Sequence, residues 1–334
     1  MALKNILLTS IVLVSISSES CSTREASNNA INEDVYIRTE DTKLFAIIRG
    51  DNSSLPILLY LHGGPGSPLG IPIFKAYSGH QLEKNFIVVY LHQRGIMNSE
   101  RVSDSAHTVS NYVKDVHHVV SYLKDRYKGQ EIFLLGHSWG GFISYMYLLE
   151  YENEVDKFVA VCTPLNSKTM LNGRIEMILQ WAINTNDHQA VNEIKTLPDK
   201  PISLSKDESA ILVKWMSKTN GGWHRNLNMK KVNDVIDYEE NIPAWLKEQK
   251  HIESILIEEI LSINLTDSIK NLYTPLLCIA GKDDTDVPWY IVKEEFENYA
   301  GPKTFILFEN SHHMVFIDEE ELFIETVTKY LIGK

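Results

Sequence analysis

The sequence has little cysteine and a deficit of basic residues. Three cysteines in 334 residues cannot form a disulfide framework for a chain of this length. The 32 lysines and arginines are outnumbered by 44 aspartates and glutamates, so the formal net charge is −12. A phosphate lattice needs a cationic face, which argues against broad nucleic-acid binding. A hydrophobic content of 44% and a charged content of 23% are typical of globular proteins and exclude a disordered, collagenous or wholly membrane-embedded chain.

The sequence also lacks the short motifs that hold metals and nucleotides. It contains no H-E-x-x-H pair of histidines, no P-loop and no dinucleotide fingerprint. We therefore expect no metal and no cofactor.

The first twenty residues predict an export signal. Lys4 forms a short basic region, and Ile6–Ile16 forms an apolar stretch of 11 residues, shorter than the roughly 20 residues of a membrane span. Small residues then lead to Cys21, which resembles the acylation site of bacterial lipoproteins, although Ser18 stands where leucine is usual. We expect an exported bacterial protein that is periplasmic or is attached to the membrane through a lipidated Cys21. Ordinary secretion is the alternative.

Short apolar runs recur after a linker over residues 21–33. Two strands are predicted around a turn, at Val35–Glu40 and Leu44–Arg49. Further apolar runs without alternation suit strands that are buried on both faces of a parallel sheet. These runs are Ile57–Leu61, Phe86–Leu91, Ile132–Leu135, Phe158–Cys162, Leu276–Ala280 and Thr304–Phe308. Because helical patterns lie between several of them, the chain is predicted to be a doubly wound α/β protein.

The stretch from Pro164 to Thr274 breaks this rhythm. Its 111 residues contain no clear buried strand but several amphipathic helical segments, at Ser167–Ile183, Glu208–Met216 and Ile252–Leu261. We interpret it as a helical cap (residues 164–274) inserted between two core strands. The core then consists of residues 34–163 and 275–334.

A serine stands in the pentapeptide Gly136-His-Ser-Trp-Gly140, which matches G-x-S-x-G. The motif follows the apolar run Ile132–Leu135 and precedes the helix-compatible stretch Phe142–Tyr151, which is the strand–turn–helix context that it requires. Small residues two positions before and after Ser138 avoid clashes in such a tight turn. We therefore predict that Ser138 is a nucleophile. A glycine-rich turn with an idle serine is the alternative.

A serine hydroxyl needs a base to accept its proton and a third group to orient that base. In this context an acid and then a histidine follow later strands. Asp283, Asp284 and Asp286 compete for the acid. We predict Asp284, because it lies three residues after Gly281 and four before Pro288, which is the familiar spacing of this loop in related proteins. The other two aspartates are then loop-capping or solvated acids.

Two adjacent histidines, His312 and His313, follow the last apolar run. We predict that His313 is the base, because it lies five residues before Asp318 and ten before Phe323, a register that matches related hydrolases. The tetrahedral oxyanion also needs two N–H donors. We expect one from Trp139, the residue after the nucleophile.

The second donor is expected from the loop His62-Gly-Gly-Pro-Gly66. Glycines let the backbone approach a substrate closely, and proline stiffens the loop.

Three motifs at this spacing resemble the proline iminopeptidase group of the α/β-hydrolases. They are His62-Gly-Gly-Pro-Gly66, Gln93-Arg-Gly95 and Gly136-His-Ser-Trp-Gly-Gly141. The resemblance covers about residues 45–163 and 275–330. It implies an α/β-hydrolase core with a helical cap, a Ser138–Asp284–His313 triad, and an oxyanion hole formed by the amides of Gly64 and Trp139. It also implies release of an N-terminal residue, often proline, from short peptides.

The sequence departs from the family's pattern at two points. His92 stands where aspartate usually precedes Gln-Arg-Gly. The family also holds the substrate's ammonium with carboxylates of the cap. Glu176, Glu239 and Glu240 are candidates for these carboxylates, although solvated helix faces explain them equally well.

Four of the six tryptophans lie in the cap. Trp181 and Trp215 among them are candidates for an apolar acyl or side-chain pocket. The core of the cap is the alternative role for both.

We predict a serine hydrolase that acts through an acyl-enzyme on a small-molecule or short-peptide substrate. Aminopeptidase activity is the leading hypothesis, and an esterase, lipase or lactonase with an apolar cap pocket is the first alternative. A serine at position 138 disfavours haloalkane dehalogenases and epoxide hydrolases, which resemble this fold but use aspartate there. A non-catalytic binding protein is the remote alternative, because all three triad members are present. The oligomeric state stays open.

Overall fold

The computed structural model describes residues 29–201, 203–219, 227–235 and 241–333. The predicted export signal, Cys21, Glu239 and Glu240 lie outside the described residues. None of the described helices is long and apolar enough to cross a membrane.

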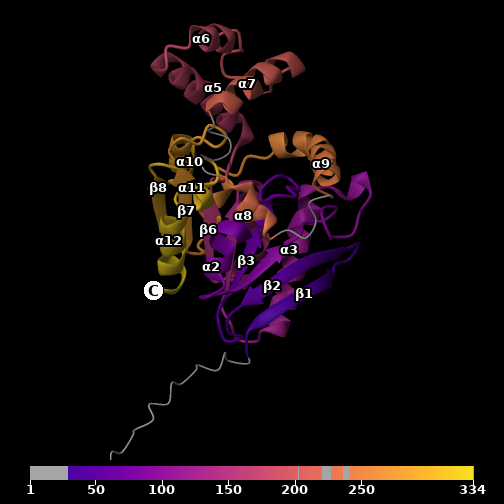
Figure 1. Ribbon diagram of the computed structural model, residues 1–334. Coiled ribbons are helices and arrows are strands. Elements are labelled where there is room, and N and C mark those ends of the chain that lie inside the picture. The colour runs from indigo at the N-terminus through magenta and orange to yellow at the C-terminus, as the bar shows by residue number, and fades with distance from the viewer. Residues whose placement is uncertain (1–28, 202, 220–226, 236–240, 334) are drawn as a thin grey trace, which may run out of the picture.

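The described strands form one sheet. Their bounds are Ile31–Arg38 for β1, Lys43–Gly50 for β2, Ile57–Leu61 for β3, Ile87–Leu91 for β4, Ile132–His137 for β5, Lys157–Val161 for β6, Leu276–Gly281 for β7 and Lys303–Phe308 for β8. The strand order is β1-β2-β4-β3-β5-β6-β7-β8 (Figure 1). β1 pairs antiparallel with β2 and β2 with β4, while all later neighbours are parallel. The predicted α/β class with a mostly parallel sheet is therefore confirmed.

Helices cover both faces of the sheet. One layer contains α3 (Val109–Arg126), α4 (Trp139–Tyr151) and α10 (Trp289–Phe296). The other contains α1 (Gly70–Phe74), α2 (His80–Leu82), α11 (Val315–Asp318) and α12 (Glu320–Ile332). A π-helical turn, Lys75–Gly79, joins α1 to α2, and 3₁₀ turns lie at Asp104–Ala106, Glu152–Glu154 and Ser268–Asn271.

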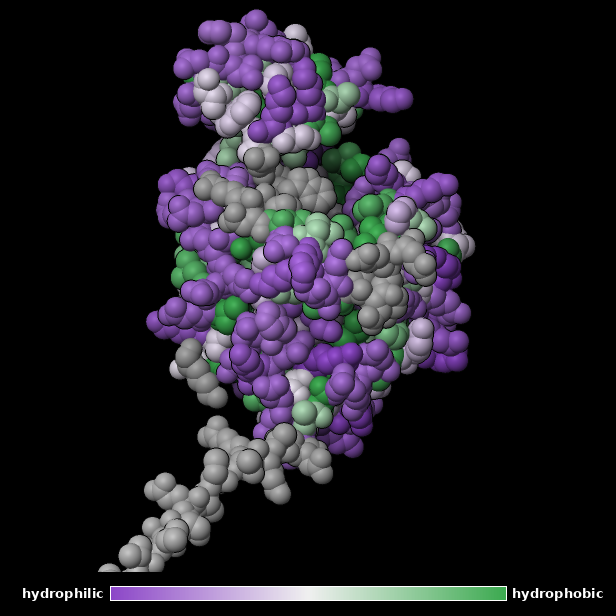
Figure 2. Space-filling model, in the orientation of Figure 1, coloured by the Kyte–Doolittle hydropathy of each residue, from purple (hydrophilic) through white to green (hydrophobic). Residues whose placement is uncertain are grey.

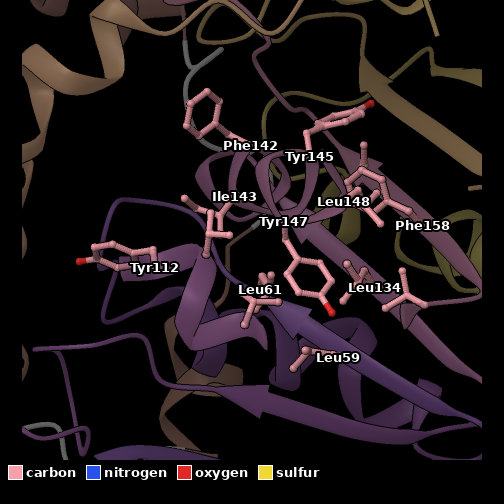
Figure 3. Close-up of a cluster of buried hydrophobic side chains, with 14 of the residues drawn as sticks. Leu59, Leu61, Tyr112, Leu134, Phe142, Ile143, Tyr145, Tyr147, Leu148 and Phe158 are labelled. Atoms are coloured by element: carbon pink, nitrogen blue, oxygen red, sulfur yellow. The ribbon is translucent and has the colours of Figure 1, made fainter. Parts of the chain in front are cut away.

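The central strands are apolar throughout because consecutive side chains point to opposite layers. In β3, Leu59 and Leu61 pack with α3 and α4, whereas Leu58 and Tyr60 pack with the other layer. Figure 3 shows the first cluster, with side chains of α4 lying over Leu59 and Leu61.

Between β6 and β7 the described residues are mainly helical. The helices are α5 (Ser167–Asn184), α6 (His188–Ile194), α7 (Lys206–Thr219), α8 (Met229–Asn233) and α9 (Ile242–Ser262). The two ends of this segment lie side by side, because Asn166 and Asn264 form an antiparallel bridge. α5, α6 and α7 pack on one another as a lobe that projects from the body (Figure 1). α9 lies against the core, where Ile252 and Leu256 are buried.

Parallel strands end at the same edge of a sheet, so the residues that follow them meet there. His62 follows β3, Gln93 follows β4 and Ser138 follows β5. Asp284 follows β7 and His313 follows β8. This edge faces the cap and holds the candidate site.

Candidate active site

Ser138 occupies the turn between β5 and α4. Its backbone has φ 53° and ψ −119°, a conformation that L-residues rarely adopt and that costs about 1–3 kcal/mol. The Ser138 N–H donates to the carbonyl of Val161 at the end of β6 (2.9 Å). This is the strand-to-helix elbow that lifts a serine hydroxyl above the sheet.

Glycines after Ser138 let the elbow pack closely. A Cβ on Gly140 would lie 2.0 Å from the carbonyl oxygen of Leu61, and one on Gly141 would lie 1.9 Å from Oγ1 of Thr163. Both distances are far shorter than van der Waals contact. The first turn of α4 therefore rests directly on the end of β3 and on the segment after β6.

His313 and Asp284 form a buried hydrogen-bonded pair. His313 Nδ1 lies 2.8 Å from Asp284 Oδ2. The other carboxylate oxygen of Asp284 accepts the backbone N–H groups of Asp286 and Val287, both at 2.8 Å. These bonds fix the carboxylate with one oxygen aimed at His313. The geometry favours a proton on Nδ1, which leaves Nε2 as an acceptor.

The neighbouring candidates have other partners. His312 Nδ1 lies 3.0 Å from Asp318 Oδ2, and the same oxygen accepts the His312 backbone N–H at 2.9 Å. The Asp283 N–H donates to the carbonyl of Ser311 (2.9 Å). Of the two adjacent histidines, His313 is the one that meets Asp284.

Asp286 places a second carboxylate beside His313. Its Oδ2 lies 3.8 Å from His313 Nε2, and its Oδ1 lies 2.7 Å from an Nη of Arg174 on α5. Burial works to raise the pKa of Asp286, but the charges of Arg174 and the nearby histidines hold this pKa below its ordinary value. The sequence suggested a capping or solvated role for Asp286. The structure corrects this interpretation, because Asp286 links the cap to the core at the site.

These charges also act on His313. Burial works to lower the pKa of His313, but the charge and hydrogen bond of Asp284 raise it, and Asp286 adds to the rise. A protonated His313 is therefore stabilised from two sides.

The glycine-rich loop after β3 lies against Ser138. A Cβ on Gly63 would lie 3.4 Å from the Cβ of Ser138. Gly64 has φ 133°, and a Cβ there would lie 2.5 Å from the backbone N of Gly66, so the turn requires glycine. On the other side, Trp139 begins α4, so its N–H is among the first four that have no intrahelical acceptor. Two backbone segments with donors thus border the serine.

Three further histidines next to the site are buried and neutral. Burial lowers the pKa of His62 to about 4 and those of His92 and His137 to about 3. His137 Nε2 lies 3.0 Å from the carbonyl oxygen of His313, so the neutral ring supports the loop as a donor. At His92, Nδ1 accepts the Asn98 N–H (3.3 Å). The position where the family usually has aspartate therefore carries no negative charge in this chain.

Ser138 lies where two cavities meet. One, of about 250 Å³, is bordered by His313, Asp286 and Glu253. The other, of about 540 Å³, extends under the cap. Its walls are mostly apolar side chains, including Phe142, Met170, Leu212, Val213, Met216 and Ile257. Figure 2 shows apolar surface in the hollow between the lobe and the body of the molecule.

Glu253 of α9 borders both cavities, and sequence analysis missed it. Gln249 Nε2 donates to its Oε1 at 2.7 Å. Burial raises the pKa of Glu253 and the charge of Asp286 adds to the rise, while Gln249 and Lys250 oppose it. A carboxylate can accept several hydrogen bonds, so Glu253 retains capacity for a cationic group in the cavity.

The predicted substrate-binding residues of the cap that the structure describes lie elsewhere. Trp215 is fully buried in the lobe, its Nε1 donates to Glu193 (2.9 Å), and its ring centroid lies 6.5 Å from that of Trp181. Glu176 is exposed on α5 and accepts the hydroxyl of Tyr290 (3.0 Å). None of Trp181, Trp215 and Glu176 borders either cavity. The two tryptophans thus take the alternative role in the core of the cap.

Cys162 lies next to the Asp284–His313 pair. Its Sγ and one ligand atom from each of the pair lie within 4.8 Å of one another. Burial raises the pKa of the thiol well above its ordinary value, and the charge of Asp284 adds to this. Because the thiolate is the form that binds metals, and because Asp284 and His313 bind each other, this trio favours an acid–base pair over a metal centre.

Comparison with known proteins connects this geometry to a family. A family model described as alpha/beta hydrolase fold matches residues 56–320. A probable aminopeptidase of Bacillus subtilis (strain 168) is 26% identical over 300 residues, covering 87% of this chain and 93% of that protein. A proline iminopeptidase of Lactobacillus delbrueckii subsp. bulgaricus is 23% identical over 303 residues, covering 90% and 97%.

Among solved structures, an esterase from Exiguobacterium antarcticum matches with a TM-score of 0.62 and 20% identity. The match covers 89% of this chain and 99% of the esterase. At this identity the likeness concerns the fold alone.

Proposed function

The chain belongs to the alpha/beta hydrolase fold family, and we propose that it is a serine hydrolase that releases N-terminal residues from short peptides. The names of its relatives, a probable aminopeptidase and a proline iminopeptidase, support an amide substrate with a free amino end. Ser138, His313 and Asp284 are the proposed catalytic groups.

In the proposed acylation, His313 Nε2 removes the proton of the Ser138 hydroxyl while Oγ attacks the scissile carbonyl carbon. Asp284 holds the proton on Nδ1 of His313 and stabilises the imidazolium that forms. The oxyanion accepts the N–H groups of Gly64 and Trp139. His313 then gives its proton to the leaving amine as the C–N bond breaks, which produces an acyl-enzyme.

In the proposed deacylation, a water molecule replaces the leaving amine. His313 accepts a proton from this water while its oxygen attacks the ester carbonyl of the acyl-enzyme. The bond to Oγ then breaks, and Ser138 takes the proton back from His313. The products are the free N-terminal amino acid and the shortened peptide.

The position of Glu253 is the observation that supports a substrate with a free amino group. The α-amino group lies two bonds from the scissile carbonyl carbon, so its partner has to border the cavity at Ser138, as Glu253 does. A carboxylate whose pKa is raised by burial gains most from a cationic partner. Asp286 is already paired with Arg174. We therefore assign the substrate's ammonium to Glu253.

Esterase activity is the second candidate function. The apolar cavity of about 540 Å³ is of the size and character that holds small organic ligands. An acyl chain there would bring an ester carbonyl to Ser138, and the same proton transfers would follow.

The test compares kcat/KM for prolyl and leucyl arylamides in the wild type and in Glu253→Gln. The substitution keeps the size of the side chain but removes its charge. A hydrogen bond to a charged group is worth about 1.5–3 kcal/mol, so we expect a decrease of about 10- to 100-fold. Glu258→Gln, at an exposed site on the same helix, is the matched control and should leave kcat/KM unchanged.

Short-chain p-nitrophenyl esters and Ser138→Ala complete this experiment. Esters without an ammonium should lose little in Glu253→Gln, and Ser138→Ala should abolish both reactions. Equal arylamide turnover by the wild type and Glu253→Gln would remove the ammonium role. Ester turnover alone would favour the esterase, and no turnover by the wild type would favour a binding protein.

A further inference from the structure

Gln93 joins the two backbone segments that border Ser138. It follows β4, and the strand order β4-β3-β5 brings it to the strand ends that lead to His62 and Ser138. Its Nε2 donates to the carbonyl of His62 at 2.8 Å, and its Oε1 accepts from the indole Nε1 of Trp139 at 3.0 Å. One side-chain amide thus ties the glycine-rich loop to the first residue of α4.

This bridge is buried. Gln93 is 6% exposed, Trp139 is 4% exposed and His62 is fully buried. A buried donor or acceptor that loses its partner carries an unfavourable desolvation cost. The amide of Gln93 satisfies both partners only when the loop and the indole keep one separation, so the bridge holds that separation.

The residue after Gln93 anchors the bridge to the rest of the fold. Arg94 donates to both carboxylate oxygens of Asp115 on α3, at 2.8 and 2.7 Å, and to Asp41 in the turn between β1 and β2 at 3.0 Å. The side chain of Arg94 is 2% exposed. Gln93 therefore extends from a backbone that is anchored by the buried ion pair of Arg94 with Asp115 and by its half-exposed pair with Asp41.

We propose that Gln93 is a positioning residue that sets the distance between the two oxyanion donors, the N–H groups of Gly64 and Trp139. His62 lies two residues before Gly64, and the indole belongs to the residue that supplies the second donor. The inference rests on the proposed serine chemistry of Ser138, but not on whether the substrate is an amide or an ester. Donors stabilise the oxyanion only when they are aimed at the position where it develops. A shift of either donor therefore destabilises the transition state more than it destabilises the bound substrate.

The test uses Gln93→Met, which removes both hydrogen bonds and keeps a side chain of similar length. We expect kcat per active site to fall about 10- to 100-fold, with KM changed by less than about threefold. The affinity for a boronic acid, whose tetrahedral adduct places an oxygen at the oxyanion position, should fall by the same factor. Gln130→Met, which removes the remote hydrogen bond from Gln130 to the carbonyl of Ser53 (2.6 Å), should change none of these values.

Two further variants keep the test informative if Gln93→Met folds poorly. As a carboxylate, Gln93→Glu keeps the acceptor for the indole but loses the donor to His62. Trp139→Phe loses the indole donor together with part of the ring that packs on Tyr112 and Phe142. Each breaks one of the two hydrogen bonds of the bridge, so each should lower kcat per active site by less than the decrease expected for Gln93→Met.

Active sites are counted by titration with a fluorophosphonate, and stability is measured by thermal unfolding. Lower stability with unchanged kcat per titrated site and unchanged boronate affinity would overturn the proposal and leave Gln93 as a structural residue. If the wild type hydrolyses only esters, the aminopeptidase proposal fails while the ester kcat still tests Gln93. The rate of Ser138 phosphonylation gives the same test without any substrate.

Discussion

Asp286 acts on the proposed base without belonging to the proposed triad. Its carboxylate lies 3.8 Å from Nε2 of His313, the nitrogen that we propose receives the serine proton, and it is held there by Arg174. The other groups that face His313 are Asp284, which shares its proton on Nδ1, and His137, which is neutral. A negative charge at Asp286 favours the imidazolium form of His313.

Asp286→Asn is therefore expected to change the pH dependence of the reaction. In the proposed mechanism His313 accepts the serine proton only when it is neutral, so kcat/KM should rise as the pH increases through its pKa. Loss of the Asp286 charge, together with the less compensated charge of Arg174, lowers the pKa of His313. The acid limb of the pH profile of kcat/KM should thus move to lower pH. The measurement is kcat/KM of the wild type and of Asp286→Asn between about pH 5 and about pH 9. An acid limb that stays in place or moves upward would contradict this role.

Some residues of the candidate site can be predicted from the local sequence, whereas others are placed there only by tertiary contacts. The motif around Ser138 and the apolar runs before Asp284 and His313 made these positions predictable from local sequence. Glu253 is different, because it borders the cavities only through the way α9 lies over the core. Asp286 likewise depends on Arg174, which comes from the cap. Tertiary contacts of this kind leave no local signal.

At the scale of elements, the first turn of α4 is the critical contact. It supplies the Trp139 N–H and rests on the end of β3, where an added Cβ at Gly140 would lie 2.0 Å from the carbonyl oxygen of Leu61. Any side chain at position 140 has to push α4 away from β3 and from the glycine-rich loop that follows it. The elbow and the loop are therefore coupled by packing as well as by Gln93.

Gly140→Ala should test this coupling. Overpacking of a close contact costs about 1–3 kcal/mol. The displaced atoms here include the carbonyl oxygen of His62 at the start of the glycine-rich loop, which is proposed to supply an oxyanion donor, so turnover per folded molecule should also fall. Gly129→Ala is the control, because Gly129 has φ 83° but no atom within 4 Å of an added Cβ. It should lose about 1–2 kcal/mol from backbone strain and keep its turnover. Denaturant unfolding and kcat per folded molecule measure both effects, and normal turnover in Gly140→Ala would count against the coupling.

In the cap, hydrophobic periodicity predicts the presence of a helix but not its full length. The predicted segment Ile252–Leu261 is the second half of α9, which begins ten residues earlier at Ile242. In the first half, the five polar or charged residues 247–251 interrupt the apolar pattern, and Trp245 packs on the loop residues Ile96 and Met97. The edge strand β1 shows a similar shift, from the predicted Val35–Glu40 to Ile31–Arg38, because alternate residues of β1 are exposed.

For the whole molecule, the sequence predicted the α/β class because the central strands are buried on both faces and read as continuous apolar runs. The arrangement of the cap over the sheet did not follow from the sequence. It involves tertiary contacts between cap and core, among them the bridge between Asn166 and Asn264, the ion pair of Arg174 with Asp286, and the burial of Ile252 and Leu256 of α9 against the core. Residues of both cap and core line the two cavities at Ser138. Substrate specificity therefore depends on the whole molecule rather than on the motifs alone.

The central claim is that core and cap together form a site for a peptide with a free amino end. It is tested most directly by kcat/KM of the wild type for leucyl p-nitroanilide with a free amine and with an acetylated amine. Because acetylation removes the charge that Glu253 is proposed to bind, we predict that the free amine is hydrolysed about 10- to 100-fold more efficiently. Equal rates for the two substrates, or faster hydrolysis of the acetylated one, would contradict the claim.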